Sequence, residues 1–401
     1  MDFFGNGIVR KNGKCYFVKN ALPGEEISFT VTAEKKKYGM GNVEEISFAS
    51  LQRRKPACPY YDACGGCQFL HCSYEAESNA KENHVRRLLR NDLAECEFDF
   101  VAAESAYGYR NHAIFHMKDG KTCFYRQKSH DHIAVARCDL LAPELNRIVN
   151  EINNLSFVNC SAVELRLDNT GHNLVVLYGE DKAEAESLFA TGITDGVVFR
   201  GPNGTEYFGR KQLYYDLDGI CLNCSYQSFF QINNEMALTM LRDIKTVLHG
   251  NKDQKVLDLY CGVGTLGLYL CGDFGNLYGI EIVPEATELA RENAIANNRK
   301  GEYLTGKTEE CLGDLLKRIP QTELVIIDPP RQGLLKDTAD ILSDYGAERL
   351  LYISCEPSAL ARDLQVLTEK YQPVFCRSYD LFPRTSTVET VALLIKKQRY
   401  K

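Results

Sequence analysis

The pattern of apolar and polar positions divides the chain into three stretches. Residues 6–49 contain short β-type runs separated by turn residues, with no helical run between them. Residues 100–230 contain mostly further strand-like runs. From about residue 235, apolar runs alternate with helix-like stretches such as PEATELARENAIANN. This last rhythm is typical of a parallel, doubly wound α/β sheet.

Three domains follow from these stretches, which suits a chain of 401 residues. We expect an OB-like β-barrel over residues 1–52, because several short strands without helices can bury a common face only by curling. A β-rich central domain is expected over residues 53–230, and a Rossmann-like α/β domain over residues 231–401. Lys35, Lys36 and Lys37 in one loop of the barrel favour an RNA-binding module, although a solvated loop on a packing domain stays open.

The charge balance changes this picture locally. A formal net charge of −7 argues against non-specific wrapping of nucleic acid by the whole molecule. Residues 1–56, however, hold ten basic against six acidic side chains. A basic surface that could contact RNA is therefore expected near the N-terminus.

Hydropathy and cysteine usage indicate the compartment. No stretch approaches the ~18 consecutive apolar residues of a membrane span, and the first residues lack the apolar core of a signal peptide. Sixteen cysteines are dispersed along the chain, unlike a compact disulfide framework. We expect a cytoplasmic protein with no membrane partner and no obligate protein partner, whose cysteines serve as thiols, metal ligands or catalytic groups.

A cofactor crevice is predicted at the first strand of the α/β domain. The strand Val256–Tyr260 is followed directly by Gly262 and Gly264, which let the backbone approach a ligand closely. Glu281 follows at the end of the next strand, where a carboxylate can accept hydrogen bonds from both ribose hydroxyls. The third glycine of the dinucleotide fingerprint is missing, so S-adenosylmethionine fits better than NAD.

A candidate nucleophile lies at the same edge of the sheet. Cys355 ends a predicted strand just before Pro357 and a helix, and the helix N-terminus could lower the pKa of its thiol. A buried packing cysteine is the alternative. Asp328, in IDPPRQG, ends another strand at this rim, and Glu389 lies in the final strands.

Together these motifs resemble the RNA uracil-C5 methyltransferase family. The resemblance extends from about residue 5 to the C-terminus. It implies a class I S-adenosylmethionine-dependent enzyme that makes 5-methyluridine in RNA and carries an N-terminal TRAM domain. The matching runs are DLYCGVGTLGL, GIEIVPEA, IIDPPRQGL, YISCEPSALARDL, DLFPRTSTVETVALL, FFQIN and PACPYYDACGGCQFLHCSYEAE.

The resemblance also implies residue roles. Cys355 matches the nucleophile that adds to C6 of uracil, and Glu389 matches the base that removes the C5 proton. Asp328 matches a contact to cofactor and base. The cofactor-binding positions that match are Gln231, Tyr260 and Glu281. Two positions depart from the family pattern: Glu356 replaces an asparagine, which could raise the pKa of the neighbouring thiol, and Thr387 replaces a histidine.

A cysteine cluster precedes the central strands. Cys58, Cys64 and Cys67 could bind a [4Fe-4S] cluster or a structural zinc together with a fourth thiolate. The family resemblance favours iron-sulfur and supplies Cys138 as the fourth ligand. Cys72 is the local rival, although we expect it inside the following helix.

The remaining candidates are weaker. We assign Cys221 and Cys224 to β packing and the histidine pairs 112/116 and 130/132 to structural roles, since no carboxylates accompany the histidines. Possible RNA contacts are Arg110, Asn111, Phe229 and Phe230. The barrel and cysteine cluster resemble the ribosomal RNA branch of the family more than the short bacterial transfer-RNA branch. A transfer-RNA enzyme and a catalytically quiet RNA-binding or assembly protein remain alternatives.

Overall fold

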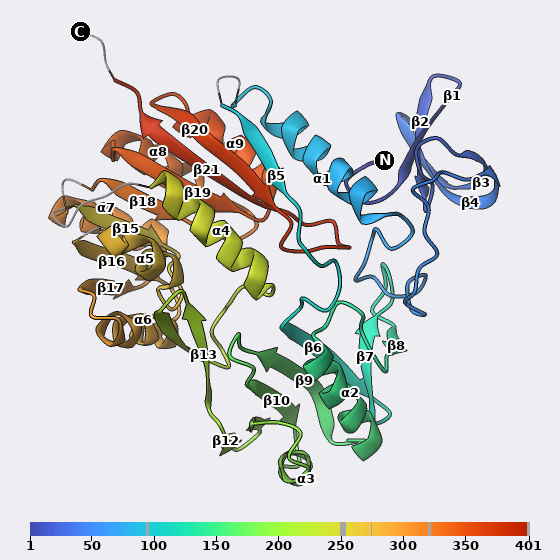
Figure 1. Ribbon diagram of the computed structural model, residues 1–401, viewed down its shortest axis with the longest axis horizontal. Coiled ribbons are helices and arrows are strands. Elements are labelled where there is room, and N and C mark those ends of the chain that lie inside the picture. The colour runs from blue at the N-terminus through green and yellow to red at the C-terminus, as the bar shows by residue number, and fades with distance from the viewer. Residues whose placement is uncertain (94–95, 249–253, 274, 320–321, 399–401) are drawn as a thin grey trace.

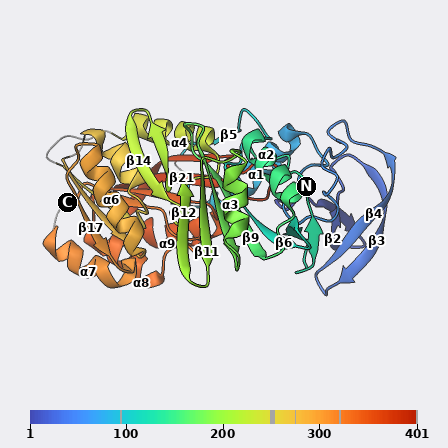
Figure 2. The same cartoon turned by 90° about the horizontal axis from the view of Figure 1, so that it is seen from below.

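The computed structural model describes residues 1–93, 96–248, 254–273, 275–319 and 322–398. Figure 1 shows a small N-terminal sheet at one end, an α/β domain at the other, and a second sheet between them. The view in Figure 2 gives the same order along the long axis. Among the described residues, no helix combines the length and apolar character that crossing a membrane needs.

The N-terminal sheet has the strand order β1-β2-β4-β3. Strands β2 and β4 pair in parallel, and the other two pairs are antiparallel. Three register shifts between β3 and β4 bend the sheet. The predicted small β domain is confirmed, while hydrogen-bonded closure into a barrel stays a prediction, because the pairing runs from β1 only as far as β3. The strands are β1 (Gly7–Lys11), β2 (Lys14–Lys19), β3 (Glu26–Glu34) and β4 (Tyr38–Phe48).

The central region is a seven-stranded sheet of order β12-β11-β10-β9-β6-β7-β8. Helices α2 (Pro143–Leu155) and α3 (Ala183–Ala190) bury their apolar residues against one face. Part of the other face packs against the hairpin of β13 (Gln212–Leu217) and β14 (Ile220–Ser225). The strands of the sheet are β6 (His112–Lys118), β7 (Lys121–Tyr125), β8 (His132–Ala134), β9 (Cys160–Leu167), β10 (Asn173–Gly179), β11 (Gly196–Gly201) and β12 (Gly204–Gly209).

The α/β domain is built on an eight-stranded sheet of order β17-β16-β15-β18-β19-β21-β20-β5. Its first five strands are parallel, and β21 runs antiparallel to both neighbours. This confirms the predicted doubly wound α/β fold. The strands are β5 (Phe98–Val101), β15 (Lys255–Leu259), β16 (Asn276–Glu281), β17 (Gly301–Thr305), β18 (Leu324–Ile327), β19 (Arg349–Ser354), β20 (Tyr371–Tyr379) and β21 (Glu389–Lys396).

Helices cover both faces of this sheet because its strands are apolar on both sides. One face buries α4, α5 and α6, and the other buries α1, α7, α8 and α9. A short 3-10 turn, Cys271–Asp273, follows α5. The helices are α1 (Tyr74–Leu89), α4 (Asn234–Val247), α5 (Thr265–Leu270), α6 (Pro284–Ala296), α7 (Thr308–Arg318), α8 (Lys336–Tyr345) and α9 (Pro357–Leu367).

The stretch from α1 to β5 differs from the predicted domain organisation. Sequence patterning places it in the central domain, but β5 pairs in parallel with β20, and the apolar side of α1 shares a core with α9. The N-terminal half of the chain therefore completes the α/β sheet (Figure 1). A four-residue strand whose partner lies far along the chain leaves no periodic signal of its own.

Candidate active site and cysteine-lined pocket

The candidate nucleophile and base lie side by side because of strand register. Strands β19 and β21 pair antiparallel with Ser354 opposite Thr390. Cys355 directly follows Ser354 at the end of β19, and Glu389 directly precedes Thr390 as the first residue of β21. Because the two strands are antiparallel, one step forward from Ser354 and one step back from Thr390 bring Cys355 and Glu389 next to each other. Asp328 follows β18, which pairs with β19 on its other side. The predicted trio therefore gathers at one edge of the sheet.

The electrostatics of this trio differ from the sequence-based expectation for the thiol. Burial raises the pKa of Cys355 to about 12, and the negative charges of Glu389 and Asp328 add to the effect, while Arg331 opposes it. The expected lowering by the helix N-terminus is wrong, because desolvation and two carboxyls outweigh it. Burial also lifts the pKa of Glu389 well above its usual range and that of Asp328 to about 7.

This shift predicts how fast Cys355 alkylates in the RNA-free protein. The thiolate is the reactive form, so below a pKa of about 12 the rate with iodoacetamide should rise about tenfold per pH unit from pH 7 to 9.5. Mass spectrometry of the Cys355 peptide measures the rate. Glutathione in the same tube is the control, because its rate should level off above about pH 9. A plateau of Cys355 reactivity near pH 7 would contradict the raised pKa.

The two departures from the family pattern occupy distinct places. Glu356 is the N-cap of α9, where its carboxylate accepts hydrogen bonds from the Ser358 amide (3.3 Å) and hydroxyl (2.7 Å). Its charge is thus engaged at the helix start, and the carboxylates that raise the pKa of Cys355 are Glu389 and Asp328. Thr387 lies half-buried in the loop before β21.

Four of the six predicted cofactor residues line a small pocket at the carboxyl end of β15. Gln231, Tyr260, Gly262 and Asp328 line it. Glu281 does not line this pocket but supports its turn, since its carboxylate accepts from the Gly262 amide at 3.0 Å and from the Val283 amide at 2.9 Å.

The turn after β15 depends on backbone conformations that few residues adopt. Tyr260 has φ +62°, Gly262 has φ +55° and Gly264 has φ +86°. Gly264 is the N-cap of α5 and lies outside the pocket lining. The Tyr260 hydroxyl donates to Glu309 at 3.1 Å, which fixes its ring at the end of the strand.

Two functional candidates were not identified from the sequence. Asp258 is fully buried in β15, and burial with the charges of Asp328 and Glu281 raises its pKa to about 8. One of its oxygens accepts from the Gly267 amide at 2.8 Å. Arg331 is exposed, and its charge acts on both Cys355 and Glu389. Both residues left a signal in the sequence. Asp258 is an acid inside an apolar strand, and Arg331 is a cation directly after the Asp-Pro-Pro run that ends a strand.

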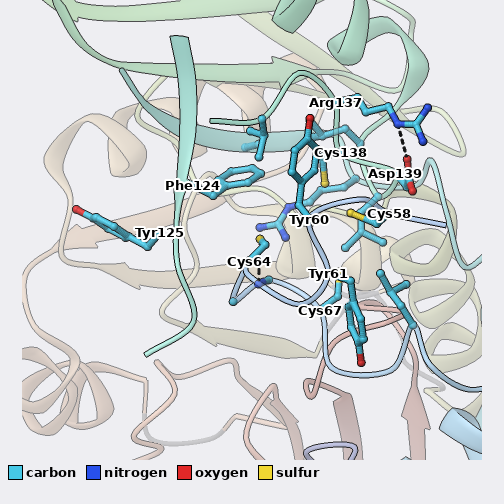
Figure 3. A pocket seen from close by; sticks show the side chains of 18 of the residues that line it. Cys58, Tyr60, Tyr61, Cys64, Cys67, Phe124, Tyr125, Arg137, Cys138 and Asp139 are labelled. Carbon is cyan, nitrogen blue, oxygen red and sulfur yellow. Dashed lines mark hydrogen bonds and ion pairs between the residues drawn. The ribbon is translucent and has the colours of Figure 1, made fainter. Parts of the chain in front are cut away.

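A second pocket, of about 390 Å³, brings the four predicted ligand cysteines together. Cys58, Cys64, Cys67 and Cys138 all line it, and Figure 3 shows their sulfur atoms turned toward a shared space beside Tyr60. Burial raises the pKa of each thiol. Among the described residues, no three Cys, His, Asp or Glu side chains are arranged to hold a metal ion.

The rival ligand lies elsewhere. Cys72 is buried with Leu22 and Phe69 in a separate small core and does not line the cysteine pocket. The expectation that it lies inside a helix is wrong: Ser73 caps α1, which begins at Tyr74. A serine with an acidic first turn was the available signal for this helix start.

The remaining predicted contacts are mostly structural. Cys221 is exposed and Cys224 is buried on the same strand, β14, so they project to opposite faces. The Asn111 side-chain nitrogen donates to the Gln231 backbone carbonyl (2.9 Å) and so helps to position the cofactor pocket. Phe229 is 70% exposed beside that pocket, whereas Phe230 is buried in the core and stacks on Tyr215.

Arg110 and the histidines lie on the central sheet. Arg110 lines the cysteine pocket. His112 forms an ion-pair contact with Glu164 at 2.9 Å, so the expectation that no carboxylate accompanies it is wrong. The other three histidines, 116, 130 and 132, surround the ring of Tyr125.

Comparisons with known proteins agree with this architecture. The family model described as tRNA (Uracil-5-)-methyltransferase matches residues 211–397. Proteins named "Uncharacterized RNA methyltransferase" from Bacillus cereus and Staphylococcus aureus are each 30% identical to this chain. The first comparison covers 97% of this chain and 94% of the relative, and the second covers 97% and 95%.

The crystal structure of Pyrococcus abyssi tRNA (uracil-54, C5)-methyltransferase in complex with S-adenosyl-L-homocysteine has the same fold. Its TM-score is 0.78 at 23% identity, over 98% of each chain. With the full-length relatives and the family model, the finding is plain: the chain belongs to the RNA uracil-5-methyltransferase family.

Proposed function

We propose that the protein transfers a methyl group from S-adenosylmethionine to C5 of a uridine in RNA through a covalent cysteine adduct. The observation that carries the proposal is the adjacency of Cys355 and Glu389 across β19 and β21, next to Asp328. Asp328 also lines the pocket that holds Gln231 and Tyr260. Nucleophile, base and cofactor pocket thus share one rim of the sheet.

The reaction needs each group in a defined protonation state. The Cys355 thiol gives its proton to solvent, its sulfur adds to C6 of uracil, and the electron pair of the C5–C6 double bond makes C5 electron-rich. S-adenosylmethionine supplies the methyl group that C5 then attacks. Ionised Glu389 removes the C5 proton, and the electron pair re-forms the C5–C6 double bond as the sulfur leaves. The raised pKa of Glu389 makes its carboxylate a strong proton acceptor.

The target base must leave its stack to reach this rim, since C6 is not accessible in a stacked strand. Phe229, exposed at the mouth of the cofactor pocket, provides a ring face for an extruded base. Arg331, also exposed, offers a positive charge at the same rim. Both support extrusion of a uridine from a single-stranded segment or loop.

We propose that the four-cysteine pocket holds a [4Fe-4S] cluster. The four thiols converge on one pocket of suitable chemistry, with Arg110 and Arg137 lining it as counter-charges to thiolates. Cys58, Cys64, Cys67 and Cys138 would hold the cluster as thiolates. Since Cys138 follows β8 of the central sheet, the bound cluster would tie the segment that carries Cys58, Cys64 and Cys67 to that sheet.

Ligand substitutions test this assignment. Anaerobically purified protein should contain about four irons and four sulfides per chain with broad visible absorbance. Cys138→Ser should lose the cluster as fully as Cys64→Ser, because an exposed cluster with a missing thiolate is labile. Cys72→Ser is the control and should retain it. Stoichiometric zinc without iron, or a cluster lost only in Cys72→Ser, would contradict the ligand set.

An aromatic surface on the central sheet supports RNA binding. Tyr125 is 40% exposed, and the ring centroids of His116, His132 and His130 lie 4.3, 5.2 and 5.4 Å from its own. Exposed Arg126 follows it directly. Rings that stack unpaired bases, next to cations that contact phosphates, are typical of single-stranded RNA sites.

Removing this ring should weaken RNA binding without changing cofactor affinity. Tyr125→Ala is expected to raise the Kd for RNA by about tenfold, since stacking contributes ~1–3 kcal/mol per base. Filter binding measures it. Val158→Ala, which removes an exposed apolar side chain elsewhere, is the control. If the two variants bind RNA with equal affinity, the surface around Tyr125 does not contribute to RNA binding.

We propose ribosomal RNA as the substrate because the cysteine motif and the N-terminal sheet resemble those of the ribosomal branch of the family. The N-terminal sheet alone does not separate the branches, since the fold of a transfer-RNA enzyme covers 98% of this chain. Labelled methyl transfer to purified large-subunit ribosomal RNA and to bulk transfer RNA, both lacking the modification, decides between them. No transfer to either RNA would favour the catalytically quiet RNA-binding protein.

None of the sixteen cysteines forms a disulfide. Sixteen cysteines without a disulfide suit a reducing compartment. We therefore place the protein in the cytoplasm.

A further inference from the structure

The loop that leads into the candidate base is held by the cysteine-rich segment. Residues 380–388, here called the base loop, connect β20 to Glu389 at the start of β21. Residues 58–72, the cysteine loop, contain three of the four pocket thiols. Figure 1 shows the base loop reaching past the end of α1 toward this segment. The two loops belong to opposite ends of the chain.

Gln68 makes three of the hydrogen bonds that organise this junction, beside the Phe69 amide, which donates to the Arg384 carbonyl at 3.3 Å, and the Arg384 guanidinium, which donates to the Cys72 carbonyl at 3.2 Å. The Gln68 backbone amide donates to the Arg384 carbonyl at 2.9 Å, and its side-chain oxygen accepts from the Ser386 amide at 2.9 Å. Its side-chain nitrogen donates to the Gly65 carbonyl at 3.1 Å. One amide side chain thus spans from the turn that holds Cys64 and Cys67 to a residue three positions before Glu389.

The far side of the base loop is anchored rigidly. Buried Lys81 on α1 contacts Glu77 and Asp380, each at 2.8 Å, with all three side chains fully buried. Glu77 also accepts from the Arg384 amide at 2.6 Å. Arg384 has φ +69°, a left-handed conformation that the neighbouring contacts impose. While α1 holds Asp380 and Arg384, Gln68 holds Ser386, three residues before β21 begins at Glu389.

The orientation of Glu389 depends on how the base loop enters β21. Pairing of β20 with β21 begins at Glu389 opposite Tyr379, so the carboxyl-bearing residue is the first of its strand. The backbone orientation at the first residue of a strand is set partly by the loop that precedes it. An error of about 1 Å in a catalytic group can cost about 10²-fold in rate.

We propose that Gln68 is a positioning residue through which the cysteine loop sets the orientation of Glu389 and thereby the rate of proton removal from C5. This inference rests on the proposed function, because it requires Glu389 to be the base. It assigns the cysteine loop a role in the last chemical step, in addition to holding its own pocket. The role is carried by the Ser386 contact.

Two substitutions at Gln68 separate this role from general stability. Gln68→Met keeps the volume but loses both the acceptor for the Ser386 amide and the donor to the Gly65 carbonyl, whereas Gln68→Glu loses only the donor and keeps the acceptor. Gln127→Met is the control, since the Gln127 backbone amide donates to the Ala63 carbonyl of the cysteine loop, while its side-chain oxygen accepts from Lys19 at 2.7 Å, outside the base loop. None of these substitutions changes Cys355 or a residue that lines the cofactor pocket.

The readout is the lifetime of the covalent RNA-protein adduct after a single turnover, followed on denaturing gels with full-length holoenzyme. Gln68→Met should prolong the adduct about 10- to 100-fold. Gln68→Glu and Gln127→Met should match the wild type within about threefold. S-adenosylmethionine affinity and iron content should be equal in all four proteins, which a purely structural role of Gln68 would not give.

Three outcomes are informative. A Gln68→Met adduct that decays at the wild-type rate overturns the inference, while a trapped adduct in Glu389→Gln in the same experiment leaves the proposed function standing. If Gln68→Met unfolds, Gln68→Glu decides, since slow decay in this folded variant would show that the Ser386 contact is not the cause. Normal turnover in Glu389→Gln would refute the base assignment and this inference together.

Discussion

Replacing Cys355 by alanine is expected to abolish methyl transfer, with a loss of about 10⁴-fold or more, while S-adenosylmethionine binding stays near the wild-type value. Without the thiol, C6 of uracil receives no nucleophile and C5 does not become electron-rich. Cys355 does not line the cofactor pocket, so the affinity for the donor should not change. Single-turnover transfer of labelled methyl groups measures the rate, and calorimetry measures the affinity.

Cys311→Ala is the matched control for this experiment. Cys311 is a partly buried cysteine on α7 that lines neither the cofactor pocket nor the cysteine pocket. It should retain full activity. Turnover by Cys355→Ala at near-native rate would refute the covalent mechanism, and an equal loss in both variants would point to damaged folding.

Replacing Glu389 by glutamine should trap the reaction after methyl transfer. The amide has nearly the same shape but does not accept the C5 proton, so the sulfur is not released and the RNA stays attached to Cys355. We expect a stable adduct that carries the new methyl group and migrates slowly on a denaturing gel. Substitution also removes a negative charge beside the thiol, which lowers its pKa and favours addition.

Glu356→Gln is the control for that result, because Glu356 caps α9 and is a second carboxyl close to Cys355 in sequence. Its variant should release RNA normally, with at most a small loss of stability from the weaker cap. Fast methylation without any adduct in Glu389→Gln would remove Glu389 from the base role. Adduct accumulation only in Glu356→Gln would reassign that role.

Strand ends were the most informative part of the sequence. Asp328 and Cys355 each end an apolar run in a βαβ pattern, and parallel strands place their carboxyl ends at one edge. Their proximity could therefore be predicted. The position of Glu389 next to Cys355 could not be predicted from patterning, because it depends on β21 entering antiparallel between β19 and β20. The family resemblance supplied that residue instead.

The thiol pKa was mispredicted for a physical reason. Position before a helix indicates a lowered pKa for Cys355, but burial and two nearby carboxyls act in the opposite direction and are stronger. Burial and long-range charge neighbours become visible only in three dimensions. With a pKa of about 12, the Cys355 thiol is protonated near neutral pH in the RNA-free protein.

Long-range connections were also beyond the sequence patterns. Spacing identified Cys58, Cys64 and Cys67 as a set, whereas Cys138 came from resemblance and is placed beside them by the fold. The hydrogen bond from the Ser386 amide to Gln68 joins residues at opposite ends of the chain and has no local signature.

Covalent methylation at C5 of uridine is tested most directly with RNA made from uridine that carries tritium at C5, together with a carbon-14-labelled methyl donor. Each turnover of the proposed mechanism puts one methyl group on C5 and expels one C5 hydrogen. The covalent mechanism predicts carbon-14 in 5-methyluridine and one tritium released to water per methyl transferred, with both signals absent in Cys355→Ala. Methyl label in any other nucleoside, or methylation without tritium release, would contradict it.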